Sequence, residues 1–133
     1  MKYIIMLAIV VGLALADFVT GIIKAYVNAD LSSEKMRKGG LNKIAEVIVM
    51  ATACGLEIGI NALGQFYQSD SLAQITGMIA AGAVFVYIVI MELISILENY
   101  GEINKDAVWI KIFIRKLRNF QKKEDAENGD KGN

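Results

Sequence analysis

The residues with the most chemical potential in this sequence are charged side chains placed inside long apolar stretches. Asp17, Lys24, Glu46, Glu57 and Glu92 each interrupt a run of apolar residues. A charge removed from water is costly unless another charge, a hydrogen-bond partner or a water-filled space meets it. Such residues can hold helices together, line a polar path, or donate and accept protons.

The sequence shows no recognisable arrangement of catalytic residues. Histidine, the commonest general base and metal ligand, is absent, and Cys54 is the only cysteine, which excludes a disulfide within the chain. No nucleophile–base pair, metal-binding cluster or phosphate-binding loop is recognisable. We therefore expect no enzymatic activity, no metal site and no cofactor.

Three apolar stretches carry the charges, and they cover residues 3–27, 44–66 and 72–97. A helix of about 20 mostly apolar residues crosses the roughly 30 Å of bilayer hydrocarbon. A soluble domain of 133 residues could not bury three helices that are apolar on nearly all faces. The sequence therefore predicts an all-α membrane protein, with one three-helix transmembrane domain over residues 1–100.

The distribution of basic residues predicts the orientation of the chain. The connection over residues 28–43 carries Lys35, Arg37, Lys38 and Lys43 against two acids, and the segment after the third span is basic up to Lys123. Basic segments stay on the cytoplasmic side of a membrane. Three spans place these two segments on one side, so we expect an outside N-terminus and a cytoplasmic C-terminus.

The first apolar stretch has an alternative interpretation as a secretory signal peptide. Lys2, the apolar core after it and Ala14-Leu15-Ala16 fit the pattern of a cleaved leader. The apolar run resumes at Phe18, however, which favours an uncleaved span. A mature chain beginning at Asp17 would have two spans and would refute the three-span interpretation.

The connection after the first span predicts a short, capped helical turn at residues 31–40. Ser32 or Ser33 can accept hydrogen bonds from the free N–H groups at its start. Gly39 can adopt the left-handed conformation that ends a helix. The simpler interpretation is a connector whose basic residues set the topology.

Several short segments follow one another from the first span into the connection after it. They are Asp17-Phe18-Val19-Thr20-Gly21-Ile22-Ile23-Lys24-Ala25, Leu31-Ser32-Ser33 and Met36-Arg37-Lys38-Gly39-Gly40, followed by Lys43. In this order and spacing they resemble the toxin-secretion/phage-lysis holins of Gram-positive bacteria and their phages. The similarity is close only from Leu13 to Lys43. The resemblance implies a homo-oligomer of the bacterial cytoplasmic membrane that opens timed lesions. An endolysin, or in some loci a large toxin, passes through these lesions and does not need to bind the holin directly.

The candidate oligomerisation or pore residues are Asp17, Thr20, Gly21, Lys24, Glu46, Glu57 and Asn61. Asp17 lies about 15 Å from the end of the first span and Glu57 about 21 Å from the start of the second, so both are expected well inside the hydrocarbon. Lys24 lies about 10 Å along the helix axis from Asp17, so we do not expect a direct ion pair between them within one helix. We expect Lys24 to extend toward the interface and Asp17 to need a partner from another helix or subunit. Gly21 would allow close approach there.

The second span carries a continuous polar face. Its members recur at steps of three or four residues: Lys43, Glu46, Met50, Ala53, Glu57, Asn61 and Gly64. This face either packs inside the chain's own bundle, or lines a subunit contact and later a water-filled lesion. Both can hold in turn if a rearrangement exposes it. The third span is the most lipid-like, and Glu92 is expected near its interface rather than in a pore.

The C-terminal region predicts a basic amphipathic helix over residues 101–123 and a disordered tail over residues 124–133. Lys111, Arg115, Arg118 and Lys122 share one side of this helix, opposite an apolar side. This pattern is typical of a helix lying on an anionic membrane surface. Nucleic acid is the weaker alternative, because the segment is tethered beside a membrane span.

The residues leave three functions open. A pore-forming lysis protein fits the resemblance, whereas the polar face would also suit a small ion channel or transporter subunit. A non-conducting membrane scaffold is the third. A lysis protein would let protein pass through the membrane, a channel or transporter subunit would change ion flux without passing protein, and a scaffold would do neither.

Overall fold

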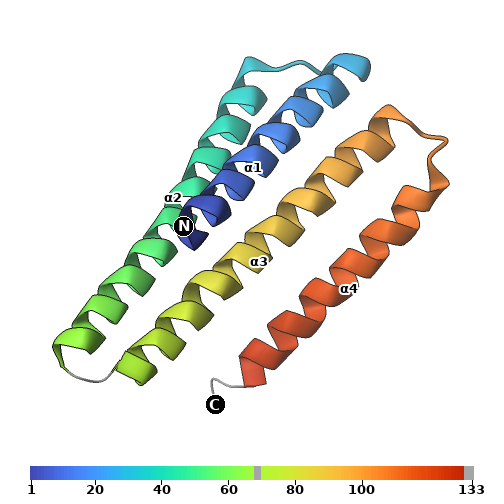
Figure 1. The fold of residues 1–133 in the computed structure, drawn as a ribbon. Coiled ribbons are helices and arrows are strands. Elements are labelled where there is room, and N and C mark those ends of the chain that lie inside the picture. Colours follow the sequence, from blue (N-terminus) through green and yellow to red (C-terminus); the bar gives the residue numbers. More distant parts are fainter. Residues whose placement is uncertain (68–69, 131–133) are drawn as a thin grey trace.

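A computed structural model describes residues 1–67 and 70–130 of the chain, and these form four helices joined by short connections. α1 spans Lys2–Val27, α2 spans Ser33–Phe66, α3 spans Asp70–Ile103 and α4 spans Val108–Asp130. The first three run up and down side by side, and α4 returns along α3 (Figure 1). Three of the helices are long and apolar enough to cross a membrane, which confirms the predicted fold class.

α3 is the helix that holds the bundle together. It packs against both α1 and α2, which contact each other less extensively. Val10, Met50, Cys54 and Ile88 meet in the buried core between the three helices. Many other apolar side chains point outward and are exposed, including Ile4, Leu15, Ile44, Ile48 and Leu63. A continuous apolar surface of this kind is rare in soluble proteins, and bilayer hydrocarbon would cover it.

The connection between α1 and α2 is a tight turn held by its own backbone. The Asp30 N–H donates to the carbonyl of Ala25 (2.9 Å), and Ala29 takes a left-handed φ of 52°, as at many helix ends. The Lys35 ammonium pairs with the Asp30 carboxylate at 2.6 Å. Ser32 caps α2, because its hydroxyl oxygen accepts from the Lys35 N–H at 3.4 Å.

The helix end predicted at Gly39 is wrong, because α2 continues through Gly39 and Gly40 to Phe66. No glycine in the described part of the chain has a positive φ. A Cβ built on either glycine would lie 3.7–3.9 Å from the ring of Phe18 on α1. These glycines therefore form a smooth surface for the Phe18 ring, and this helix–helix contact outweighs their tendency to end a helix.

α4 is longer than the amphipathic helix that the sequence predicts. It begins at Val108 and continues to Asp130, so residues 124–130 are helical where disordered chain was expected. Lysine, glutamate, alanine and glutamine around residues 121–127 are good helix formers, and they extend the turns before them. Residues 131–133 of the predicted tail lie outside the described residues.

Candidate functional site

Lys43 is the centre of a buried charge cluster that joins all three membrane-spanning helices. Its ammonium lies 2.7 Å from the Asp17 carboxylate on α1 and 2.7 Å from the Glu92 carboxylate on α3. It also lies 3.4 Å from Glu46 on its own helix. Asp17 thus finds its partner on another helix of the same chain. Glu92, expected near the membrane interface, is enclosed on the inward side of α3 with only 1% of its surface exposed.

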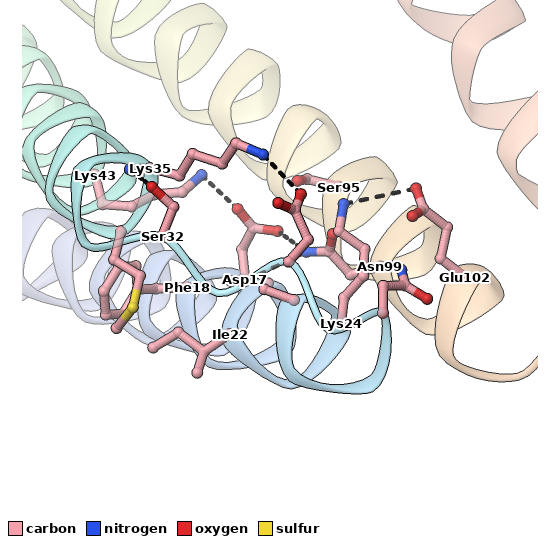
Figure 2. A pocket seen from close by; sticks show the side chains of 16 residues that line it. Asp17, Phe18, Ile22, Lys24, Ser32, Lys35, Lys43, Ser95, Asn99 and Glu102 are labelled. Carbon is pink, nitrogen blue, oxygen red and sulfur yellow. Dashed lines mark hydrogen bonds and ion pairs between the residues drawn. The ribbon is translucent and has the colours of Figure 1, made fainter.

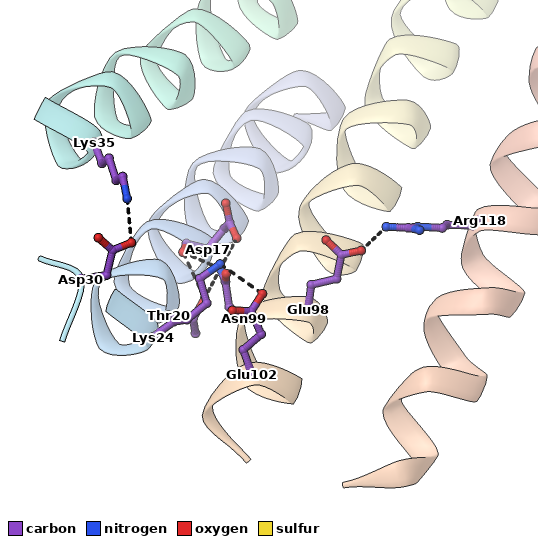
Figure 3. A network of polar contacts seen from close by, with 9 residues as sticks. All are labelled: Asp17, Thr20, Lys24, Asp30, Lys35, Glu98, Asn99, Glu102 and Arg118. Carbon is purple, nitrogen blue, oxygen red and sulfur yellow. Dashed lines mark hydrogen bonds and ion pairs between the residues drawn. The ribbon is translucent and has the colours of Figure 1, made fainter. Parts of the chain in front are cut away.

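Asn99 of α3 completes the surroundings of Asp17. Its Nδ2 donates to Asp17 Oδ1 (2.9 Å) and to Thr20 Oγ1 (3.2 Å), while the Thr20 hydroxyl donates to the Asp17 carbonyl (3.0 Å) (Figure 3). Gly21 leaves room for this contact, because a Cβ there would lie 3.6 Å from Asn99 Nδ2. A buried hydrogen bond to a charged group contributes about 1.5–3 kcal/mol. Asn99 therefore ties α3 to α1 beside the ion pairs.

Asn99 was not among the candidate residues that the sequence indicated. The available signal was its spacing, because Asn99 follows Glu92 by two helical turns and so lies on the same face of α3. Two polar residues on one face of an otherwise apolar span indicate an inward face. The partner of that face could be found only from the packing.

The Lys43 cluster contains more acid than base. Three carboxylates, those of Asp17, Glu46 and Glu92, surround one ammonium, so the cluster carries a formal charge of −2 when every group is ionised. The Glu92 Oε2 atom is buried and has no hydrogen-bond partner among the described residues. Lys43 is therefore the shared counter-ion on which the burial of Asp17 and Glu92 depends, whereas Glu46 is partly exposed.

A second polar layer lies where α1 begins. The Glu57 carboxylate of α2, which is 2% exposed, accepts from the Lys2 ammonium (2.5 Å) and from the Tyr3 hydroxyl (2.9 Å). Lys2 itself remains half exposed, so its charge is partly hydrated. One turn farther along α2, the Asn61 Oδ1 atom is buried without a partner among the described residues.

The two polar layers lie apart along the axis of the bundle. From Lys43 to Glu57, α2 rises about 21 Å, and the core around Met50 and Cys54 fills the space between. A hydrocarbon layer about 30 Å thick, centred on this spacing, would place each polar layer about 4–5 Å inside its own face. The expected position of Asp17 and Glu57 well inside the hydrocarbon stays a prediction.

Asp17 and Lys43 of the cluster also line a polar pocket at the α1–α2 connection. The side chains around this pocket include Asp17, Lys24, Lys35 and Asn99 from the three helices (Figure 2). Lys24, expected to extend toward the interface, lies 3.6 Å from the carboxylate of Glu102 near the end of α3. The pocket thus links the cluster to the exposed charged groups at this end of the bundle.

The structure brings most of the candidate residues together, but not all. The polar face of α2 points into the bundle, and Met50, Ala53, Glu57 and Gly64 on it are buried. This is the arrangement of a face packed inside its own chain.

The residues of the connection motif lie elsewhere. Ser33, Arg37 and Lys38 lie exposed on the first turns of α2, outside both polar layers. No group of three or more Cys, Asp or Glu among the described side chains could hold a metal ion.

Comparison with known families extends the resemblance far beyond the first loop. A family model described as the bacteriophage holin family matches residues 2–119, which include all of α1, α2 and α3 and half of α4. The chain belongs to the bacteriophage holin family. Searches of curated proteins and of solved structures found no match. Holins are in general membrane proteins without enzymatic activity, in keeping with the three apolar helices of this family member.

Proposed function

We propose that this holin-family chain accumulates in the bacterial cytoplasmic membrane, oligomerises, and opens timed lesions that release an endolysin or a large toxin. Family membership supports the proposal. The observation that carries it is the inward polar face of α2, whose charges are paired within a bundle that is apolar outside. A chain built in this way can remain in the bilayer without forming a lesion. It still contains the polar surface that a water-filled lesion needs.

In the folded chain, each buried carboxylate contacts a lysine of the same chain. Lys43 meets acids from α1 and α3, and Glu57 meets Lys2 and Tyr3 from α1. The Lys43 layer therefore depends on α1 and α3 staying against α2, and the Glu57 layer depends on α1 doing so. If neighbouring subunits separate these helices, water can replace the lost partners and hydrate the polar face, which turns it into the wall of a lesion.

The orientation proposed for this chain has an outside N-terminus and a cytoplasmic C-terminus. The α1–α2 connection and the end of α3 lie at the same end of the bundle (Figure 1), where Lys24 also pairs with Glu102. The basic residues of the α1–α2 connection and of α4 are therefore attached to one end. The preference of basic segments for the cytoplasm supports this orientation.

The test of this function is inducible expression in a bacterium that also makes a cytoplasmic endolysin without an export signal. After a delay, the chain should abruptly collapse the membrane potential, and the culture should lyse only when the endolysin is present. Higher expression should shorten the delay. Cells that carry endolysin alone, and cells that carry the chain alone, are the matched controls.

Two outcomes would contradict the proposal. A selective channel or transporter subunit would change ion flux while the endolysin stays inside the cell. A scaffold would change neither the membrane potential nor the release of endolysin, even when the chain is abundant in the membrane fraction.

A cytoplasmic reporter protein larger than the endolysin, assayed in the medium before wall degradation, would measure whether the lesion also passes a cargo of toxin size.

A further inference from the structure

The helix α4 has three different stripes along its length. Ile110 is 1% exposed and lies 3.5 Å from the Cβ position of Gly101 on α3, and Ile114 and Leu117 follow on the same half-buried side. A second stripe is aromatic and open: Trp109, Phe113 and Phe120 are exposed by 58%, 49% and 60%. The apolar side predicted for α4 is therefore divided, and only part of it faces α3.

The third stripe of α4 is basic. Lys111, Arg115, Arg118 and Lys122 line a shallow groove on the flank opposite the aromatic stripe. Between residues 105 and 123 the chain carries seven basic residues and one acid. A helix with an aromatic flank and a basic flank fits the bilayer interface, where rings lie at the headgroup level and cations meet lipid phosphates.

The attachment of α4 to the bundle is narrow. Among the described residues, α4 packs against α3 and no other helix. Beyond the Ile110–Gly101 contact, the attachment includes an ion pair between Arg118 and Glu98, both partly exposed (Figure 3). Exposed ion pairs contribute little to stability. The connection before α4, residues 104–107, is a short irregular turn whose Ala107 N–H donates to the Asn104 carbonyl at 3.2 Å.

The position of α4 along α3 conflicts with embedding of the bundle in a bilayer. α4 starts at the charged end of α3 and runs back beside it (Figure 1). In a membrane, this position would hold the later turns of this basic helix beside the hydrocarbon that surrounds α3. Charged groups at that depth are unfavourable unless they meet protein partners or water. The short turn at residues 104–107 can instead absorb a change in helix direction.

We propose that α4 is a hinged helix that leaves α3 in the membrane and lies on an anionic lipid surface. It turns about residues 104–107, places its basic stripe against lipid phosphates, and inserts Trp109, Phe113 and Phe120 at the headgroup level. The Arg118–Glu98 pair is exchanged for an Arg118–phosphate contact. This inference rests on the membrane location of the chain and not on lesion formation.

The position of residue 120 relative to the bilayer tests this inference. Trp109 is the only tryptophan, so the pair Trp109→Phe and Phe120→Trp moves the sole indole to a site on the same open stripe, far from the hinge. The full-length chain is reconstituted in vesicles of phosphatidylcholine, with or without one third phosphatidylglycerol. Indole emission, quenching by iodide, and quenching by lipids labelled at shallow or deep acyl positions are then measured.

In phosphatidylglycerol vesicles, the emission at residue 120 should shift to shorter wavelength, and iodide quenching should fall about threefold or more relative to phosphatidylcholine vesicles. Shallow lipid labels should quench more than deep ones. Replacing Lys111, Arg115 and Lys122 together by glutamate should abolish the difference between the two lipids. The matched exchange of Lys111→Arg, Arg115→Lys and Lys122→Arg keeps the charge and should preserve the difference between the two lipids.

Three results would overturn the inference. Emission that is independent of phosphatidylglycerol would remove the lipid surface as the partner. Stronger quenching by deep labels would show α4 docked against α3 within the hydrocarbon. Protection of residue 120 by duplex DNA but not by phosphatidylglycerol would identify nucleic acid as the polyanion. The assay involves no lysis, so each result leaves the proposed lesion to be judged by endolysin release.

Discussion

Replacing Lys43 by methionine should destabilise the folded three-helix bundle by about 3–5 kcal/mol, because it leaves buried carboxylates without their counter-ion. Lys43 lies within 2.7 Å of acids on both neighbouring helices. The free energy of unfolding can be measured by titration with sodium dodecyl sulfate in mixed micelles. In cells, at equal chain levels in the membrane, the same variant should trigger lysis earlier than the unmodified chain.

Matched variants separate the role of the ion pairs from the general loss of a basic residue. Lys38→Met removes a lysine from an exposed position of the same helix, and it should change the free energy of unfolding by less than about 0.5 kcal/mol. Lys43→Arg keeps the charge, and its free energy of unfolding should lie between those of the unmodified chain and the Lys43→Met variant. Lys43→Met combined with Asp17→Asn, Glu46→Gln and Glu92→Gln should recover most of the loss, because no buried charge remains unpaired. Equal stability of the Lys43→Met and Lys38→Met variants would refute the role of the cluster.

Replacing Asn99 by aspartate should destabilise the bundle by about 2–3 kcal/mol, although the two side chains have nearly the same shape. Asn99 Nδ2 donates to Asp17 Oδ1 at 2.9 Å, and the substitution puts a second carboxylate in its place. The loss therefore combines a missing hydrogen bond with repulsion between like charges. The same titration in mixed micelles measures it, and the rate of endolysin release provides the cellular readout.

The control for this prediction is an exchange of donor and acceptor. Asn99→Asp together with Asp17→Asn restores one donor and one acceptor at the contact, and the double variant should be more stable than the sum of the two single changes predicts. Asn104→Asp introduces the same chemistry at an exposed position beyond α3 and should have little effect. Additive effects of the two changes at residues 17 and 99 would contradict a direct contact between them.

The helices and the polar face of α2 could be predicted because they depend on local pattern. Length and hydropathy identify the spans, and spacing at three and four residues places Glu46, Glu57 and Asn61 on one side of α2. The pairings could not be predicted in this way, because they depend on the axial offset between helices. α1 begins at the level of Glu57, and this offset brings Asp17 opposite Lys43.

The local signals that misled the sequence analysis are those that packing overrides. Gly39 has the conformational freedom to end a helix, but the ring of Phe18 packs against it and α2 continues. Lys43 resembles a topology-determining loop residue, but α2 begins about three turns earlier than the predicted span, and Lys43 lies inside the bundle between the acids of α1 and α3. In both cases the deciding contact comes from another helix, which the sequence around the residue does not contain.

We propose that the inward face of α2 is enclosed at rest and meets water in the lesion. Cys54 lies on this face, is 3% exposed, and is the only cysteine of the chain, so the unmodified protein carries its own probe. A water-soluble maleimide is added to expressing cells at intervals before and after the membrane potential collapses, and labelling of Cys54 is measured by mass spectrometry. A variant with Cys54→Ser and Ala51→Cys, whose probe lies on the outward side of α2, is the matched control. Cys54 should stay unlabelled before the collapse and become labelled within the same interval as endolysin release. A Cys54 that remains unlabelled while endolysin escapes would contradict the claim.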